Sequence, residues 1–264
     1  MEQGNGTAGP RIALLVQYDG TGFNGWQIQN SGRTVQGEIE RAVHVLLRTR
    51  VRVTASGRTD SGVHALGQVV HFNAPGGVNL QKMCIGLNGV LSGDIAVKNV
   101  YRVGAGFHSR FSAVEREYRY LIHNHPSRTP FMKYRAMWVH ERLDCDYLKE
   151  VARHCIGEMD FSSFCKKRES KHINTVRRIR AVDIRKDNDL IIIDIAGNAF
   201  LHNMVRIIIG TMVEMNKKNS APGFITEIIA RRDRESSGLT APAYGLYLKS
   251  VTYDPSLESM ESAF

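Results

Sequence analysis

The order of strand-like and helix-like segments is the feature that most constrains the fold of this chain. In the first half, apolar residues recur at helical spacing after Thr34 and again after Asn79, and both residues are suited to capping a helix. The segments with strand-like composition around these two helices are 11–17, 51–55, 67–73 and 94–103. The resulting order of strand, helix, strand, strand, helix and strand is the ferredoxin-like pattern.

The second half repeats that order with one additional helix. Asp144 is a candidate N-cap for a helix that Gly157 ends, and residues 201–213 carry a long apolar face. Pro222 suits the first turn of a further helix. The segments predicted as strands are 115–123, 175–185, 190–196 and 244–253.

These patterns predict an α+β protein made of two ferredoxin-like (βαββαβ) halves with antiparallel sheets. The predicted N-terminal domain is residues 1–106, and the predicted C-terminal domain is residues 107–264. A central cleft between the two halves is the expected ligand site, because clefts of this kind are common binding sites. The polar tail 255–264 is expected to be loose.

Charge and cysteine usage indicate the kind of partner and compartment. The chain has 264 residues with a formal net charge of +9, which favours a polyanionic partner such as nucleic acid. Residues 1–10 have no apolar core for a signal peptide, and the apolar runs are too short to span a membrane. The cysteines form no C-x-x-C pair, and Cys84 and Cys155 lie on apolar helical faces. We therefore expect a cytoplasmic protein with buried thiols and no membrane partner.

The segment from Gly57 to Ala65, which reads GRTDSGVHA, is the strongest candidate for a reactive site. The glycines allow backbone angles that other residues avoid, which indicates a tight loop. Asp60 follows Arg58 by two residues, and a nearby guanidinium favours the ionised carboxylate. Such a carboxylate is able to act as a nucleophile or a base.

Three other motifs have weaker support. The Gly20-x-Gly22-x-x-Gly25 pattern follows a strand, but no helix opens there, as a dinucleotide site would need. Ser61 lacks the G-x-S-x-G surroundings of a serine nucleophile, so a turn hydroxyl is the preferred interpretation. His123 and His125 alternate at a strand end, but no third ligand with suitable spacing is evident, and no metal site is predicted.

Basic and aromatic residues supply the features expected of a phosphate-binding groove. Arginines and aromatics near the junction of the halves suit base stacking, although buried strand aromatics have the same appearance in a sequence. Arg206 lies in an apolar helix and needs an anionic partner there, for which Asp60 is the preferred candidate. The basic clusters are Arg48, Arg50 and Arg52; Lys166, Lys167, Arg168 and Lys171; Arg177, Arg178 and Arg180; and Arg231, Arg232 and Arg234. The aromatics are Phe107, Phe111, Tyr118 and Tyr120.

With these residues assembled, the chain closely resembles the tRNA pseudouridine synthase A (TruA) family over almost its whole length. The GRTDSGVHA segment is the most specific match, and further motifs of the family occur in the same order along the chain. These motifs are YDG at 18–20 with GWQ at 25–27, RTVQG at 33–37, FHSRFSA at 107–113, YRY at 118–120, DFSSF at 160–164, FLHNMVR at 200–206 and TAPAYGL at 240–246.

The resemblance implies an isomerase that converts uridines at positions 38, 39 and 40 of the tRNA anticodon stem-loop to pseudouridine. Asp60 matches the catalytic aspartate, and Arg58 matches an arginine that assists base flipping. Tyr118 matches the tyrosine that stacks on the target base, Arg206 the arginine that pairs with the carboxylate, and Leu246 an apolar residue of the pocket. The family implies a homodimer in which each tRNA touches both subunits, and no cofactor.

Several alternatives stay open at the level of sequence. Asp60 could attack the ribose C1′ or the uracil C6, and the residues do not decide between them. A non-catalytic RNA-binding module and a hydrolase that uses Ser61 are the competing functions. No stretch of the chain has the aromatic RNP1 pattern that would favour the first of these.

Overall fold

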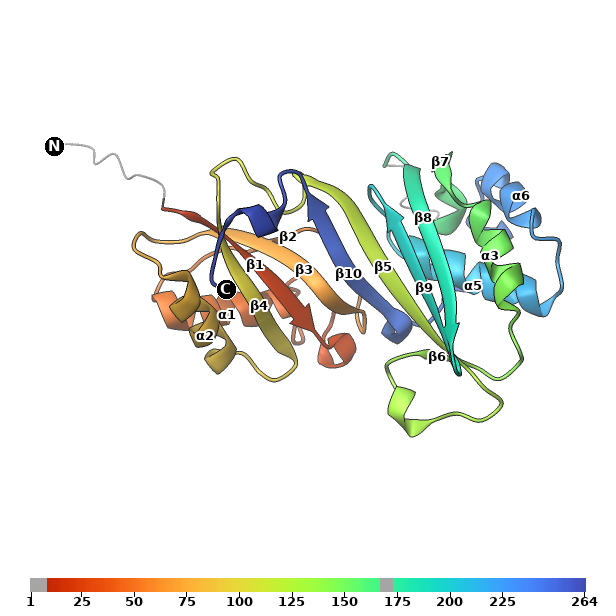
Figure 1. Cartoon of the computed structure of the whole chain (residues 1–264), viewed down its shortest axis with the longest axis horizontal. Coiled ribbons are helices and arrows are strands. Elements are labelled where there is room, and N and C mark those ends of the chain that lie inside the picture. Colours follow the sequence, from red (N-terminus) through yellow and green to blue (C-terminus); the bar gives the residue numbers. More distant parts are fainter. Residues whose placement is uncertain (1–8, 167–172) are drawn as a thin grey trace. The chain divides into compact units, whose positions relative to one another are not determined.

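The computed structural model describes residues 9–166 and 173–264 (Figure 1). It divides into two compact units, of which the first is Met1–Val114 with Ser250–Phe264 and the second is Glu115–Lys249. The sequence predicted a domain boundary after residue 106, with residues 107–264 forming the second domain. The observed first unit is instead discontinuous in the chain, because the C-terminal residues return to it.

The first unit has the predicted order of elements. These elements are β1 (Arg11–Tyr18), α1 (Val35–Leu47), β2 (Thr54–Ala55), β3 (His64–Asn73), α2 (Leu80–Val90) and β4 (Ile95–Val103). Both predicted N-caps are present: the Thr34 hydroxyl accepts a hydrogen bond from the Gly37 amide at 3.3 Å, and the Asn79 side chain accepts one from Lys82 at 2.8 Å. The predicted strand 51–55 is shortened to β2.

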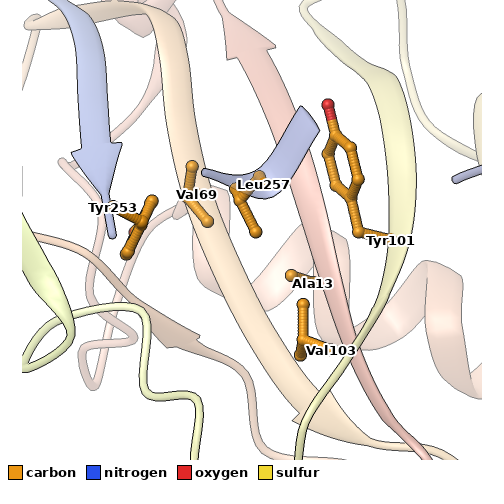
Figure 2. Close-up of a cluster of buried hydrophobic side chains, with 6 residues drawn as sticks. All are labelled: Ala13, Val69, Tyr101, Val103, Tyr253 and Leu257. Atoms are coloured by element: carbon orange, nitrogen blue, oxygen red, sulfur yellow. The ribbon is translucent and has the colours of Figure 1, made fainter. Parts of the chain in front are cut away.

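The strands of the first unit form an antiparallel sheet in the order β4-β1-β3, with β2 on β3 and the short C-terminal strand β11 (Glu261–Ser262) on β4. Ile12, Leu14 and Val16 are completely buried on one face of β1. The other face carries Ala13, which belongs to a cluster of six buried residues (Figure 2). This cluster comprises Ala13, Val69, Tyr101, Val103, Tyr253 and Leu257.

The C-terminal tail is ordered, which corrects the expectation of a loose end. Strand β10 (Leu246–Tyr253) is followed by the short 3-10 helix η6 (Leu257–Ser259) and by β11 (Glu261–Ser262), which pairs with β4. Tyr253 and Leu257 keep only 5% and 8% of their surface exposed, because they cover the apolar cluster shown in Figure 2. Burial of these two side chains offsets the polar composition of the tail and fixes it to the first unit.

The second unit contains more strands than predicted. Its elements are β5 (Ala113–Asn124), β6 (Met137–Val139), α3 (Cys145–Arg153), β7 (Gly157–Asp160), β8 (Val176–Asp187), β9 (Leu190–Gly197), α5 (Met204–Lys217) and α6 (Phe224–Arg231). The predicted hairpin is confirmed as β8 and β9, and the strands β5-β9-β8-β7 are neighbours in an antiparallel sheet. The short strands β6 and β7 were missed. The helices α3, α5 and α6 lie on one side of β8 and β9 (Figure 1).

A charged cluster lies on the β5–β9 surface of the second unit. Asp194 alternates with the buried Ile193 and Ile195, so its side chain points to the opposite face of the sheet. Its carboxylate accepts two hydrogen bonds from Arg119, both 2.8 Å, and one from Lys249 at 3.0 Å. Burial alone would raise the pKa of Asp194, but the bonds and charges of Arg119 and Lys249 lower it to about 2.

The four cysteines are free thiols, and Cys84, Cys155 and Cys165 are buried. Burial raises the pKa of Cys155 to about 12, which keeps this thiol protonated and unreactive. Within residues 9–166 and 173–264, no helix combines the length and apolar character needed to cross a bilayer.

Candidate active site

Asp60 lies in the loop that connects β2 to β3 in the first unit. Arg58 is exposed, Asp60 is half-buried and Thr59 between them is buried, so the loop presents a cation and a carboxylate around an anchored residue. The Val63 amide donates to the Asp60 carbonyl at 3.1 Å, and Gly62 adopts a φ of +79°. The predicted tight loop is therefore confirmed, with a left-handed glycine completing the turn.

A buried polar network holds this loop from below. The Tyr18 hydroxyl and the Thr59 hydroxyl are 2.8 Å apart, and burial raises the pKa of Tyr18 to about 12, so its proton stays in place. Gln68 is completely buried and donates to the Gly57 carbonyl at 2.9 Å, while it accepts from Ser56 at 2.6 Å. These contacts hold the loop on which Asp60 lies, and none of the three involves the Asp60 side chain.

The Gly20–Gly25 segment packs directly against the same loop. Gly20–Gly22 is a single 3-10 turn and α1 begins only at Val35, so the missing helix excludes a dinucleotide fingerprint. A Cβ atom on Gly20 would lie 2.0 Å from the Val63 carbonyl oxygen, and one on Gly25 would lie 2.8 Å from that of Thr59. The glycines allow this close approach of two backbones, which is their role here.

The contacts of Ser61 support a structural role for its hydroxyl. Ser61 donates to the Phe23 carbonyl at 3.1 Å. His64, the nearest histidine in the chain, is 1% exposed; its Nδ1 atom accepts from the Gly20 amide at 3.0 Å and lies 3.1 Å from the Asp19 carboxylate. The turn-hydroxyl interpretation of Ser61 therefore has structural support that the serine-hydrolase interpretation lacks.

The remaining predicted site residues, Tyr118, Arg206 and Leu246, belong to the second unit. The segment 239–246 connects α5, which carries Arg206, to β5, which carries Tyr118. Arg206, in the first turn of α5, donates through Nε to the Ala241 carbonyl and through Nη1 to the Asn203 side chain, both at 2.8 Å. On β5, the Tyr120 hydroxyl donates to the Pro242 carbonyl at 2.8 Å. The segment 239–246 thus binds α5 and β5 together, and it ends at the buried Leu246.

Tyr118 lies two residues before Tyr120 on β5 and is half-buried. Its ring packs edge-on against Phe200 with a centroid distance of 5.2 Å. Tyr120 is completely buried, and so it is a core residue and not a stacking surface. Phe107 packs on Tyr253 at 5.0 Å, whereas Phe111 is 77% exposed. Of the four aromatics singled out in the sequence, Phe111 is therefore the most open to a base, Tyr118 and Phe107 are half-buried, and Tyr120 is excluded.

The basic clusters differ in how far acidic neighbours neutralise them. Arg180 is paired with Glu115, Arg232 with Asp160, and Arg52 is 3.7 Å from Glu40. Lys167, Arg168 and Lys171 lie outside the described residues. The described part of the chain contains no group of three or more His, Cys, Asp or Glu side chains that could hold a metal ion. His123 and His125 stack on each other at 5.9 Å, and a ring nitrogen of each lies near the Ser127 carbonyl.

The comparisons with known proteins identify the family of the chain. A family model described as tRNA pseudouridine synthase matches residues 14–112 and 151–254. The chain belongs to the tRNA pseudouridine synthase family. Asp60 and Arg58 fall in the first matched range and Arg206 and Leu246 in the second, whereas Tyr118 lies between the two.

Curated relatives in this family resemble the chain over most of its length. A protein named tRNA pseudouridine synthase A from Bacillus subtilis is 42% identical over 246 residues, which cover 92% of this chain and 99% of the relative. Proteins of the same name from Methylococcus capsulatus and Brachyspira hyodysenteriae are 41% and 43% identical, over 92% and 90% of this chain and 89% and 96% of theirs. The similarity is therefore to whole synthases and not to one domain.

The supporting residues Tyr18, Thr59 and Gln68 were missed as parts of the site. Gln68 offered a signal, because a glutamine inside a strand of apolar residues must find hydrogen-bond partners if it is buried. Tyr18 offered none, since its position is that of an ordinary core residue at a strand end.

Proposed function

We propose that this protein isomerises uridine to pseudouridine in the anticodon stem-loop of tRNA, at positions 38, 39 and 40. The observation that carries the proposal is Asp60 itself. Its loop is braced by buried hydrogen bonds and by glycine contacts, and it lies inside the region matched by the pseudouridine synthase family. A carboxylate held on a rigid backbone is preorganised for attack on a bound substrate.

In the proposed reaction the target uridine first leaves the base stack, which costs a few kcal/mol. Arg58 assists this step, and Tyr118 stacks on the extruded base while Leu246 borders its pocket. Asp60 then attacks either C1′ of the ribose or C6 of the uracil. In both cases the N1–C1′ bond breaks, a C5–C1′ bond forms and the temporary bond between Asp60 and the attacked carbon is released. The hydrogen at C5 leaves as a proton, which Tyr118 or water accepts, and N1 gains a proton. The rearrangement is redox-neutral, and we propose that it needs no cofactor.

The finer architecture belongs to the same proposal. We propose that the two units are ferredoxin-like halves that border a central cleft, in which Arg206 of the second unit pairs with Asp60 of the first. We further propose a cytoplasmic homodimer in which each tRNA contacts both subunits. The family assignment, the mixed α+β composition and the net charge of +9 support this view.

The decisive experiment is the Asp60→Asn variant, assayed on unmodified tRNA. It should bind tRNA like the wild type and form no pseudouridine, because the amide preserves the shape of the side chain and removes the nucleophile. Asp146→Asn is the matched control, since this carboxylate is 89% exposed in the first turn of α3, and it should leave activity unchanged. Substantial conversion by Asp60→Asn would refute the proposed chemistry.

The same assay separates the competing functions. A non-catalytic RNA-binding module would bind the anticodon stem-loop without producing pseudouridine in the wild type. A hydrolase based on Ser61 would lose its activity in Ser61→Ala, whereas the proposed synthase should keep most of its rate in that variant. Retention of pseudouridine formation by Ser61→Ala would therefore discard the hydrolase.

A further inference from the structure

The segment 125–140 of the second unit exposes large aromatic side chains that a folded protein usually covers. It contains the 3-10 helix η2 (Pro130–Met132) and β6 (Figure 1). Phe131 is 88% exposed, Tyr134 49% and Trp138 44%. Three exposed aromatic rings within eight residues are unusual for an ordinary loop, and such a concentration marks an interaction surface.

This segment is also basic throughout. It carries Arg128, Lys133 and Arg135 and contains no aspartate or glutamate. Neither Arg128 nor Lys133 forms an ion pair with any residue in the described ranges, and the Lys133 ammonium lies 5.0 Å above the Tyr134 ring. The next acidic residue along the chain, Glu141, is bound to Lys217 at 2.6 Å and lies 3.2 Å from the His140 ring at the end of the segment, away from Arg128 and Lys133 in the chain.

Hydrogen bonds hold the segment in one conformation. The Trp138 indole donates to the His125 carbonyl at 2.9 Å, and the Ala136 amide donates to the Met132 carbonyl at 3.1 Å. The Tyr247 hydroxyl donates to the Arg135 carbonyl at 2.8 Å. Because the backbone is already fixed, a ligand that binds the exposed rings has little ordering entropy to overcome.

The segment is attached beside the residues assigned to the pocket of the second unit. The Tyr134 ring packs edge-on against Tyr244, with centroids 6.1 Å apart, and Tyr247 holds Arg135 as described above. Tyr244 and Tyr247 flank Leu246 in the chain. Tyr134 and Arg135 therefore connect the segment to the residues that flank Leu246 in the chain.

We propose that the 125–140 segment is an additional RNA-binding surface, where an unpaired base of the tRNA stacks on Phe131 and neighbouring phosphates contact Arg128 and Lys133. The proposal rests on tRNA being the substrate. Aromatic rings beside cations are the combination with which proteins hold single-stranded nucleic acid, since every base has a face for stacking. The complete lack of acidic residues favours a polyanion over a protein partner, whose surface would offer charges of both signs.

The stacking contact is tested by changing Phe131 and measuring the Kd for full-length tRNA together with kcat and KM. Phe131→Ala should raise Kd and KM by roughly 5- to 150-fold with kcat unchanged, because the proposed contact is with a base other than the one that reacts. Phe131→Trp should keep wild-type affinity, whereas Phe131→Leu should behave like the alanine variant, since it is apolar but has no ring. Phe264→Ala is the control, because that ring is 70% exposed in the first unit, and it should change nothing.

The phosphate contacts are tested by a pair of lysine variants. Lys133→Ala and Lys218→Ala remove the same charge from exposed positions of the second unit, but Lys218 is bound to Glu214 and lies outside the segment. Lys133→Ala should lower the slope of log Kd against log salt by about 0.7 to 0.9, the value for one lost phosphate contact. Lys218→Ala should leave the slope unchanged.

The possible failures are distinguishable. If the wild type forms no pseudouridine, the proposed function is wrong. If the wild type is active and Phe131→Ala binds tRNA normally, the proposed function stands and the segment is not an RNA-binding surface. If Phe131→Ala changes the sedimentation behaviour of the protein and not its tRNA affinity, the segment is a protein interface and the inference is overturned.

Discussion

A single methyl group added at Gly25 should damage the Asp60 loop, because Gly25 packs against the backbone on both sides of Asp60. The φ of Gly25 is +81°, a left-handed conformation that costs an alanine about 1–2 kcal/mol. The new Cβ would lie 2.8 Å from the Thr59 carbonyl oxygen and 3.1 Å from the Ser61 amide nitrogen. Both atoms are backbone of the loop, so the side chains have no way to relieve the contact.

The size of the effect follows from these distances. Moving the Thr59 oxygen from 2.8 Å to an ordinary contact of about 3.4 Å requires a shift of about 0.6 Å. That shift also strains the hydrogen bond from the Trp26 amide to the same oxygen, which is 3.0 Å long and contributes about 1 kcal/mol. We expect Gly25→Ala to lose about 2–3 kcal/mol of unfolding free energy. A displacement of this size at a reacting group should lower kcat on the order of tenfold.

The assay is urea denaturation combined with single-turnover pseudouridine formation. Gly22→Ala is the matched control, because it lies in the same glycine-rich segment. The nearest atom to its added Cβ is the tip of Arg33 at 4.0 Å, so it should be within about 0.5 kcal/mol of the wild type. The reasoning is refuted if Gly25→Ala has normal stability and kcat, or if both alanine variants are equally impaired.

Two further predictions concern stability. Asp194→Asn should cost about 2 kcal/mol at pH 7, because the pKa of Asp194 is lowered from 3.8 to about 2 and each unit corresponds to about 1.36 kcal/mol. Since the folded state lowers this pKa, the stabilisation is complete above about pH 4 and is lost toward pH 2. The difference between wild type and variant in urea titrations should therefore fall to about half near pH 3. The control Asp183→Asn, at a 67% exposed position, should stay within about 0.5 kcal/mol of the wild type at pH 7. Tyr253→Phe should cost about 1 kcal/mol in the same denaturation assay, because the buried Ser109 carbonyl loses the 2.7 Å bond from the Tyr253 hydroxyl, and an unchanged midpoint would contradict that role.

The periodic segments of the fold could be predicted because their signals are local. Helix α1 shows this best, since Thr34 caps it and its apolar residues repeat on one face. The short strands β6 and β7 could not be predicted in this way, because three or four residues are too few to show a period. The ordered tail was missed because its stability comes from a distant sheet and not from its own composition.

The residues of the candidate site also differ in whether a local sequence pattern reveals them. Asp60 and Arg58 were recognisable because a glycine-bounded loop with opposite charges is a local pattern. The supports of the loop were not recognisable in this way, since Tyr18 reaches Thr59 from 41 residues away and Gln68 is a polar residue of strand β3 whose hydrogen-bond partners the sequence does not show. The exposed aromatic rings of the 125–140 segment were not predicted either. The exposure of a ring depends on which neighbouring residues cover it in the folded protein, and the sequence alone does not show this.

The discontinuous first unit has a consequence for the synthesis of the protein. Residues 1–114 leave the ribosome long before residues 250–264, which supply Tyr253, Leu257 and the edge strand β11. Until residues 250–264 emerge, the nascent domain has an uncovered apolar face around Ala13 and Val103 and an unpaired β4 edge, both of which favour aggregation. We expect this domain to mature only after these residues have been synthesised, so that a stop codon before them would leave even the Asp60 half of the protein incomplete.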